Sequence, residues 1–328
     1  MVLVIGGAGY VGSHVLHALR GANEAHLAYD DFSSGWEPAL KGSPCIRGDL
    51  LDTDFLTQTL LDHPEIDTLM VFAAKISVGE SVRHPELYHH VNTGGIASAL
   101  TAMERAGLRR IIMSSTAAVY GNPLGPLVED HPKNPTSPYG ESKWNAERLI
   151  GEAGVDSIRF RYFNAAGAAP EHGLGEHHEP EEHLIPLCID AALGRRDGIA
   201  LFGEDYPTPD GTCVRDYIHV LDLADAHVRA LHYLRANGGS QALNLGTGQG
   251  HSVCEVIQTV QEEVGPFDVR HEGRRPGDPS ELVARCEKAE QLLGWKATRS
   301  DLRSLVRDAA AFRRDRPDGY RKLTKSTG

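Results

Sequence analysis

Long apolar runs, cysteine and positive charge are all scarce in this sequence. No apolar run is long enough to span a membrane, and an apolar strand pattern that starts at Val2 leaves no room for a secretory signal. The five cysteines are odd in number and show no C-x-x-C spacing, which favours reduced thiols in a cytoplasmic protein. With 33 basic against 45 acidic residues, the net charge of -12 argues against a nucleic-acid footprint. We therefore expect a cytoplasmic protein without nucleic-acid or membrane partners.

Glycine, by contrast, is concentrated near the start of the chain. Residues 2–5 form a continuous apolar run, typical of a strand buried on both faces of a parallel sheet. Gly6, Gly9 and Gly12 follow in the spacing G-x-x-G-x-x-G, and residues 14–20 have the apolar period of a helix. A glycine turn lets the backbone approach a pyrophosphate, and a helix N-terminus offers it free N–H groups. The order of strand, glycines and helix therefore predicts a dinucleotide site.

The acid at the end of the next strand pattern indicates which dinucleotide binds. Residues 27–29 are apolar and end at Asp30, whose carboxylate can accept hydrogen bonds from ribose hydroxyls. The same carboxylate would repel a 2′-phosphate, and no arginine follows closely, so NAD is favoured over NADP. Asp49 ends a further short strand pattern. It is expected either to accept a hydrogen bond from the adenine amino group or to cap a helix.

Strand and helix patterns alternate from the N-terminus to about residue 165. This alternation predicts an α/β fold built on a Rossmann-type doubly wound parallel sheet. The remainder has more irregular, loop-like stretches and predicts a smaller C-terminal α/β substrate domain. The predicted division is 1–165 for the NAD-binding domain and 166–328 for the substrate domain, with part of 215–247 packing back on the first.

A tyrosine and a lysine carry the strongest catalytic signal. Residues 137–143 read SPYGESK, in which the serine can cap a helix and the proline suits its first turn. Tyr139 and Lys143 then lie one turn apart on the same face. An ammonium beside a phenol, helped by the positive nicotinamide ring, lowers the tyrosine pKa from about 10 toward neutrality. We predict Tyr139 as the base, with a hydroxyl partner from 114–116, where Thr116 is last.

Eight segments spread over most of the chain carry a resemblance to a known family. They begin with GGAGYVGS at residue 6, VGESV at 78, SSTAAVYG at 114 and SPYGESK at 137. They continue with RYFNAAGA at 161, DYPTPDGTCVRDYIHVLDLADAH at 205, NLGTG at 244 and RRPGD at 274. By these segments the chain resembles the extended short-chain dehydrogenases/reductases, and among them the sugar-nucleotide 4-epimerases.

This resemblance implies an isomerase of galactose metabolism that interconverts UDP-galactose and UDP-glucose with a tightly bound NAD. In such enzymes C4 gives its hydride to NAD, the 4-keto sugar rotates, and the hydride returns to the other face. Thr116 holds the position of the catalytic Ser/Thr, Tyr139 that of the base and Lys143 that of its partner.

The same resemblance assigns two sets of binding residues. The cofactor set is Gly6, Gly9, Tyr10, Val11, Gly12, Asp30, Asp31, Asp49, Leu50, Phe72, Ala73, Ala74, Asn92, Ser114, Tyr139, Lys143 and Tyr162. The substrate set is Thr116, Tyr139, Asn164, His183, Leu184, Phe202, Arg215, Tyr217, Arg275 and Asp278.

Within the substrate set, the two arginines would clamp the diphosphate, Phe202 would pack on the uracil and Asp278 would hold the ribose. The alternative is that Arg215 forms a surface ion pair with Asp216 and that Phe202 belongs to the core.

Several positions depart from the family pattern. Ile5 stands where a threonine is common, Ile76 where a lysine is, and Val91 and His183 where asparagines are. These departures affect individual contacts rather than the chemistry. Leu282 occupies a position that is often tyrosine, and its smaller side chain would leave room for an N-acetyl group at C2. An epimerase acting mainly on an N-acetylated or other UDP-sugar is therefore the alternative function.

Sugar-nucleotide dehydratases and decarboxylases share the tyrosine–lysine pair but are less favoured. Elimination of water needs an acid and a base directly after the catalytic threonine, whereas Thr116 is followed by Ala117 and Ala118. Asp30 disfavours a reductase that uses NADPH. A nucleotide sensor without activity would be expected to lose the tyrosine–lysine pair, which is present here.

A histidine-rich stretch and two helix patterns complete the expectations. Four histidines and five glutamates crowd into residues 171–183, but their spacing matches no tight metal motif. We interpret this stretch as a solvated substrate loop and predict no metal site. By analogy with the family, helices around 96–105 and 144–150 are expected to pair two copies into a homodimer.

Overall fold

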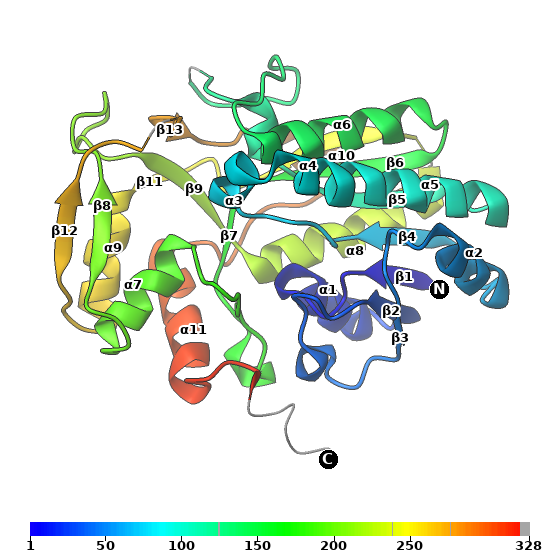
Figure 1. The fold of residues 1–328 in the computed structure, drawn as a ribbon, viewed down its shortest axis with the longest axis horizontal. Coiled ribbons are helices and arrows are strands. Elements are labelled where there is room, and N and C mark those ends of the chain that lie inside the picture. The colour runs from blue at the N-terminus through cyan, green and yellow to red at the C-terminus, as the bar shows by residue number, and fades with distance from the viewer. Residues whose placement is uncertain (124, 238, 276, 322–328) are drawn as a thin grey trace.

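The computed structural model describes residues 1–321 except 124, 238 and 276. Its main feature is a seven-stranded sheet in the order β10-β6-β5-β4-β1-β2-β3, in which every pairing is parallel (Figure 1). The strands are β1 (Val2–Ile5), β2 (His26–Asp30), β3 (Cys45–Arg47), β4 (Thr68–Val71), β5 (Arg110–Thr116), β6 (Asp156–Tyr162) and β10 (Gln241–Leu245). The strand order reverses between β1 and β4, so the predicted doubly wound parallel sheet is confirmed.

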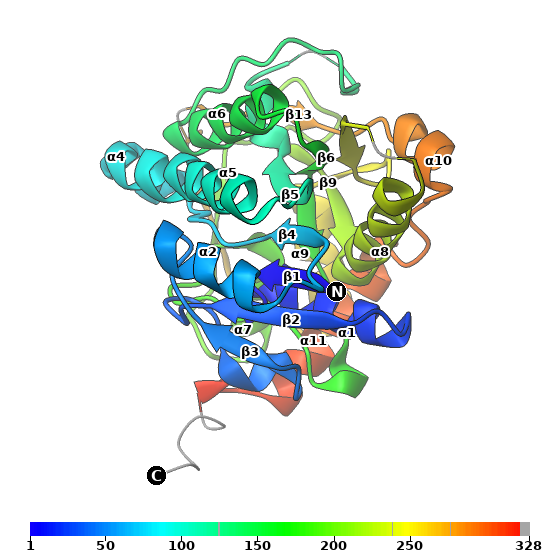
Figure 2. The same cartoon turned by 90° about the vertical axis from the view of Figure 1, so that its right-hand side faces the viewer.

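Helices cover both faces of this sheet (Figure 2). One face carries α1 (Tyr10–Gly21) and α8 (Val220–Asn237); the other carries α2 (Thr53–Asp62), α5 (Gly94–Ala106) and α6 (Pro138–Glu152). Successive strand residues point to opposite faces, so Val2 and Val4 join the α1–α8 core while Leu3 and Ile5 join the other core. Both faces are therefore apolar, as the uninterrupted run at residues 2–5 predicts.

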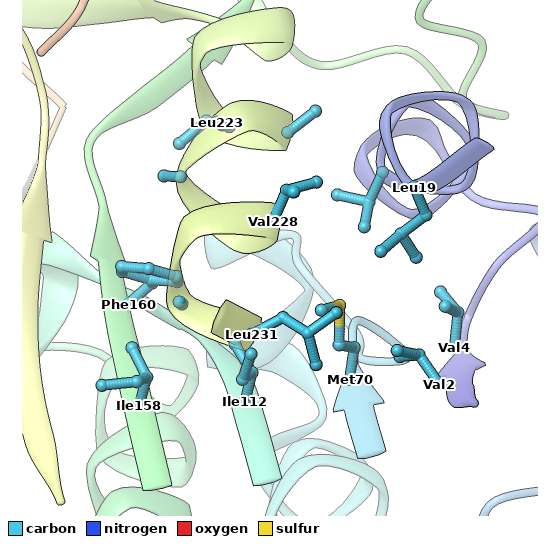
Figure 3. Packing of buried hydrophobic residues seen from close by; sticks show 14 of the residues in the cluster. Val2, Val4, Leu19, Met70, Ile112, Ile158, Phe160, Leu223, Val228 and Leu231 are labelled. Carbon is cyan, nitrogen blue, oxygen red and sulfur yellow. The ribbon is translucent and has the colours of Figure 1, made fainter. Parts of the chain in front are cut away.

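Side chains of α8 fill the core between the sheet and α1 (Figure 3). Leu231 of α8 lies beside Met70 of the sheet, and Val228 points toward Leu19 of α1. Leu19, Leu223 and Leu231 are fully buried, and each such side chain contributes roughly 1.5–3 kcal/mol through removal from water. A helix from the second half of the chain thus completes the core of the first sheet.

The second half builds a smaller, more irregular α/β region. A short sheet has the order β11-β9-β13, with β7 also paired to β9, and β8 pairs with β12. Its strands are β7 (Asn164–Ala166), β8 (Ile199–Phe202), β9 (Val214–His219), β11 (Gly250–Ser252), β12 (Val269–Glu272) and β13 (Glu281–Leu282). Its helices are α7 (Leu184–Ala192), α9 (Val253–Glu263), α10 (Glu287–Leu293) and α11 (Leu302–Asp315). The division of the chain at residue 165 stays a prediction.

Short helices connect the main elements, and none of the helices described is long and apolar enough to cross a membrane. They are α3 (Val78–Arg83), α4 (Pro85–Tyr88), the π-helical turn η2 (His89–Thr93) and the 3₁₀ turns η1 (Glu37–Leu40), η3 (Ala117–Tyr120) and η4 (Pro170–His172).

One strand differs from the expected length. The apolar run 68–74 predicts a strand to Ala74, but β4 ends at Val71. The N–H groups of Phe72 and Ala73 both donate to the carbonyl of Ile5, at 2.8 and 3.2 Å. Two donors on one carbonyl cannot continue a ladder, so the chain leaves the sheet at this point.

A buried ion pair joins α6 to the sheet. Arg161 of β6 donates from Nη2 to Glu147 Oε2 of α6 at 2.7 Å, and both side chains are almost inaccessible to solvent. The Ser115 hydroxyl of β5 donates to the other Glu147 oxygen at 2.5 Å. One carboxylate therefore connects two neighbouring strands to the helix that carries Tyr139 and Lys143.

We expect Glu147→Gln to lower the free energy of unfolding by about 3–5 kcal/mol, because it leaves the Arg161 charge buried without its counter-ion. The matched control is Asp54→Asn, which breaks the exposed 2.8 Å pair between Asp54 and Arg105 and should cost about 1 kcal/mol or less. Urea unfolding followed by circular dichroism measures both. Equal costs for the two variants would contradict a special role for the buried pair.

Candidate active site

The three predicted glycines play different structural parts. Gly6 has a φ of 80°, and a Cβ there would lie 2.5 Å from the amide nitrogen of Ala73. A Cβ at Gly12 would lie 2.1 Å from the carbonyl oxygen of Gly6. At Gly9 the nearest atom would be 3.4 Å away, an ordinary contact. Gly6 and Gly12 are thus required by the turn itself, whereas Gly9 leaves open space at the N-terminus of α1, where a pyrophosphate fits.

Asp30 is buried at the carboxyl end of β2 and is held by the neighbouring backbone. Its oxygens accept hydrogen bonds from the N–H groups of Ala8 and Phe32, at 2.8 and 2.9 Å. Burial raises the pKa of this carboxyl group, and the two hydrogen bonds oppose that rise. Arg47 pairs in register with Asp30 on β3, and its guanidinium lies 5.5 Å from the centre of the Phe32 ring. Sequence spacing did not place this cation near Asp30, because the contact depends on strand pairing.

Two further cofactor candidates have defined local partners. Asp49 is exposed and accepts from the N–H of Leu51 at 2.9 Å, while Asp52 is the residue that caps α2. The helix-cap alternative for Asp49 is therefore wrong. The Asn92 side chain accepts from the N–H of Lys75 at 2.8 Å and donates to Ser142 Oγ at 3.0 Å. Asn92 thus ties the segment after β4 to α6.

The predicted catalytic residues meet at the carboxyl end of β5. Ser137 caps α6 by accepting from the N–H of Gly140 at 3.2 Å, as predicted. Lys143 is buried one turn after Tyr139 and donates from Nζ to the carbonyl of Ser114 at 2.9 Å. Thr116, the last residue of β5, accepts from the N–H of Ala118 at 3.1 Å, and its side chain acts on Tyr139 so as to lower the tyrosine pKa.

The pKa of Tyr139 differs from the prediction. Burial raises the pKa of Tyr139, and the interaction with the Thr116 side chain only partly opposes this. Burial also lowers the pKa of Lys143 to about 8, against the attraction of Glu147. The expectation that Lys143 makes Tyr139 acidic is wrong for the protein alone, since the ammonium is directed at the Ser114 carbonyl. A lowered pKa for Tyr139 needs another positive charge.

The other cofactor candidates line the same edge of the sheet. The Tyr10 hydroxyl donates to the carbonyl of Gly167 at 2.7 Å, and the Tyr162 hydroxyl is 2.6 Å from Nε2 of His227. The remaining members are exposed Asp31, buried Leu50 and Ser114, and partly buried Val11, Phe72, Ala73 and Ala74.

Three substrate candidates come together at the end of β8. The Arg275 guanidinium lies 4.8 Å from the centre of the Phe202 ring, and Arg275 Nε donates to Asp278 at 3.0 Å. Phe202 is partly buried and not fully enclosed in the core. An aromatic face, a guanidinium and a carboxylate in one place can bind a base, a phosphate and a ribose.

The remaining substrate candidates lie on or beside β9. Asn164 and Tyr217 are register partners, and Asn164 Nδ2 donates to the carbonyl of Asp216 at 2.9 Å. Arg215 is the register partner of Leu282, so these two candidates are adjacent across β9 and β13. Leu184 begins α7 and packs against the core of the smaller region.

The alternative interpretation, in which Arg215 forms a surface ion pair with Asp216, is wrong. Asp216 is fully buried, and its oxygens accept from Thr247, Gly248 and Ala284 at 2.8–3.2 Å. Arg215 donates from Nη1 to the carbonyl of Val214. Asp216 is thus an anchor for the turn after β10, a role that no local pattern reveals, because its partners lie on distant segments.

A glycine turn, an acid at the end of the second strand, and Thr116 and Tyr139 beside the buried Lys143 on a doubly wound sheet define a dinucleotide-binding enzyme of the short-chain dehydrogenase/reductase type. The chain belongs to the NAD dependent epimerase/dehydratase family, whose family model matches residues 2–246. The resemblance carried by the sequence motifs is thereby confirmed.

Individual relatives match along nearly the whole chain. A UDP-glucose 4-epimerase of Rhizobium leguminosarum bv. trifolii is 46% identical over 314 residues, which are 94% of this chain and 95% of the relative. One from Rhizobium meliloti (strain 1021) is 47% identical over 301 residues, 90% of this chain and 92% of the relative. The solved structure of UDP-glucose 4-epimerase from Brucella ovis in complex with NAD has a TM-score of 0.91 and 42% identity, covering 94% of this chain and 97% of that one.

We expect Gly9→Ala to fold normally but to bind NAD about tenfold more weakly or worse, equivalent to about 1.4 kcal/mol, because the new methyl group enters the pyrophosphate space. Gly12→Ala should lower the melting temperature, since its Cβ has no room. Gly21→Ala, at the other end of α1 with no atom within 4 Å, is the control. Circular dichroism and NAD titration of cofactor-free protein measure both effects. Unchanged NAD affinity in Gly9→Ala would place the pyrophosphate elsewhere.

Proposed function

We propose that this protein interconverts UDP-galactose and UDP-glucose, using a tightly bound NAD. The observation that carries the proposal is the meeting of Thr116, Tyr139 and Lys143 at the carboxyl end of β5, on the edge that holds the glycine turn. Relatives at 46–47% identity over at least 90% of both chains are UDP-glucose 4-epimerases.

The residues present fit NAD. Gly9 leaves space beside the N–H groups that begin α1, and Asp30 sets a carboxylate at the end of β2. When bound, NAD supplies the oxidant that removes a hydride from C4 of the sugar and the reductant that restores it.

Tyr139 is the proton acceptor in this proposal. Its phenolate oxygen takes the proton from the C4 hydroxyl as the hydride departs, and returns it when the opposite epimer forms. Thr116 holds the oxygen of C4 and relays the proton, and Lys143 keeps a positive charge beneath the site. Since burial raises the pKa of Tyr139 in the protein alone, we expect its phenolate only when the cationic cofactor is bound.

In this proposal the smaller region binds the diphosphate and the uridine of the substrate. Arg275 is 61% exposed and free to turn from Asp278 to a phosphate, while Phe202 offers a ring face to uracil. Three further substrate candidates lie on two paired strands: Arg215 and Tyr217 on β9, and Asn164 on β7. The diphosphate then tethers the sugar at one end, which leaves the 4-keto ring free to rotate.

Loss of water is not supported by the residues after Thr116. Ala117 and Ala118 form the 3₁₀ turn η3 and bring no acid or base to C5 and C6. The dehydratase and decarboxylase alternatives are therefore not favoured.

We expect Tyr139→Phe to reduce kcat by about 10²–10⁴-fold while the protein stays folded, because the proton acceptor is removed. The assay is conversion of UDP-galactose to UDP-glucose by purified protein, first without added NAD. Tyr88→Phe is the matched control, since the Tyr88 ring packs edge-on against Tyr139 at 6.3 Å and its hydroxyl donates to Glu80.

Full activity in Tyr139→Phe would refute the assigned base. Equal losses in Tyr139→Phe and Tyr88→Phe would point to disturbed packing instead of a lost proton acceptor.

We also propose that the protein works as a homodimer in the cytoplasm. The helices α3 and α4 pack against α6 and leave apolar side chains in solvent, of which Val82 is 65% exposed and Val78 50%. Such a surface next to α5 and α6 supports pairing of two copies. Sedimentation equilibrium should give twice the chain mass of 35.6 kDa, and Val82→Glu should shift the mass toward that of one chain.

All five cysteines are unpaired, which suits a reducing compartment such as the cytoplasm.

A further inference from the structure

The irregular segment before α7 brings two imidazoles and two carboxylates to one point. Glu176, His178, Glu181 and His183 each direct one ligand atom into the group, and the four atoms all lie within 4.8 Å of one another. His183 Nδ1 is 2.9 Å from Oε1 of both glutamates. His178 Nδ1 is 3.2 and 3.8 Å from the same two oxygens. Each imidazole nitrogen therefore lies within 3.8 Å of both carboxylate oxygens.

These separations match those around a four-coordinate metal ion. Zinc binds imidazole nitrogen and carboxylate oxygen at about 2.0–2.2 Å, which places neighbouring ligand atoms about 3.3 Å apart in a tetrahedron. The four measured separations run from 2.9 to 3.8 Å and bracket that value.

The second observation is a polar atom without a hydrogen bond. His178 Nδ1 is buried and has no hydrogen-bond partner among the residues that the structure describes. Although Glu176 lies only 3.2 Å away, the contact lacks the alignment of a hydrogen bond. The Glu181 oxygen is 3.8 Å from the same nitrogen, beyond hydrogen-bond distance. A buried nitrogen in this position needs a partner at the centre of the group.

Neighbouring contacts fix these side chains from outside. Arg313 of α11 donates to the outer oxygen of Glu181 at 2.8 Å and also pairs with Asp190. Between the ligands, the backbone carbonyl of His177 accepts from Trp36 Nε1 at 3.1 Å. Outer contacts of this kind are typical of metal sites, where they orient the ligands.

We propose that Glu176, His178, Glu181 and His183 bind one divalent zinc-type metal ion in a closed structural site. Four protein ligands leave no open position for a substrate, so the ion would brace the segment and take no part in the reaction. Two imidazoles disfavour Mg²⁺ and Ca²⁺, which prefer oxygen ligands alone. This assignment replaces our interpretation of residues 171–183 as a solvated, metal-free loop, since Glu176 is only 6% exposed. It also replaces the substrate contact that the resemblance implies for the His183 side chain.

The position of the site gives it a role in the fold. His178 packs edge-on against the Tyr10 ring, with 6.2 Å between ring centres, at the first residue of α1. His183 immediately precedes α7. The ion would therefore join the glycine-turn end of the large sheet to the first helix of the smaller region.

The competing explanation is that the two histidines and the two glutamates form ion pairs with each other, without a metal ion. In that state the carboxylates raise the pKa of His178 to about 9, so both imidazoles would be cations balancing two anions. Direct measurement of metal binding separates the two explanations.

The test uses full-length protein without an affinity tag, stripped with a chelator and dialysed. We expect titration with Zn²⁺ to give one ion per chain and to raise the melting temperature. Co²⁺ should give the intense visible absorption of a tetrahedral site. His178→Ala should lose the bound ion, whereas His172→Ala should keep it, since His172 is an exposed histidine of the same segment that faces Glu171.

Glu176→Gln, which preserves shape, serves as a second variant if His178→Ala does not fold, and it should weaken Zn²⁺ binding at least about tenfold. Absence of Zn²⁺ binding by the stripped protein, or equal binding by His172→Ala and a folded ligand variant, would overturn the proposal. Metal content and melting temperature do not depend on epimerase activity. Failure of this site is therefore distinguishable from failure of the proposed function.

Discussion

The carboxylate of Glu147 is the contact on which the arrangement of the catalytic residues depends. It follows Lys143 by one turn on the same face of α6, as Lys143 follows Tyr139, so docking of one residue positions the other two. Ser115 and Arg161 hold it from β5 and β6. A buried anion is tolerated only with such partners. Side chains that take no part in the chemistry thus determine where the proton acceptor lies.

Local patterns made much of the fold and site predictable. The glycine turn follows its strand directly, and Thr116 ends the strand that precedes the capped helix of Tyr139 and Lys143. Strand and helix periods therefore suffice to bring these residues to one edge of the sheet. Contacts between segments far apart in the chain could not be foreseen, and the burial of Asp216 among distant backbone donors is one example. The direction of the Lys143 ammonium was likewise invisible, because a shared helix face does not fix where a flexible side chain ends.

The histidine-rich segment shows a different limit. Residues 176, 178, 181 and 183 lie in neither a helix nor a strand, so no periodicity relates their side chains. Their convergence follows from the path of the backbone, which contacts from Trp36 and Arg313 hold in place. Metal motifs recognisable by spacing rest on regular elements, and an irregular loop provides none.

The place of β10 in the large sheet has a consequence for synthesis on the ribosome. Gln241 pairs with Ile158, so β6 has a bare edge until the chain has been made beyond β10. Until then the N–H and C=O groups along this edge of β6 are unpaired, and α8 does not yet cover Phe160. Other chains can pair with such an edge or contact the exposed ring. The nascent N-terminal half is thus an incomplete folding unit. Its safe completion depends on prompt translation of the half that follows.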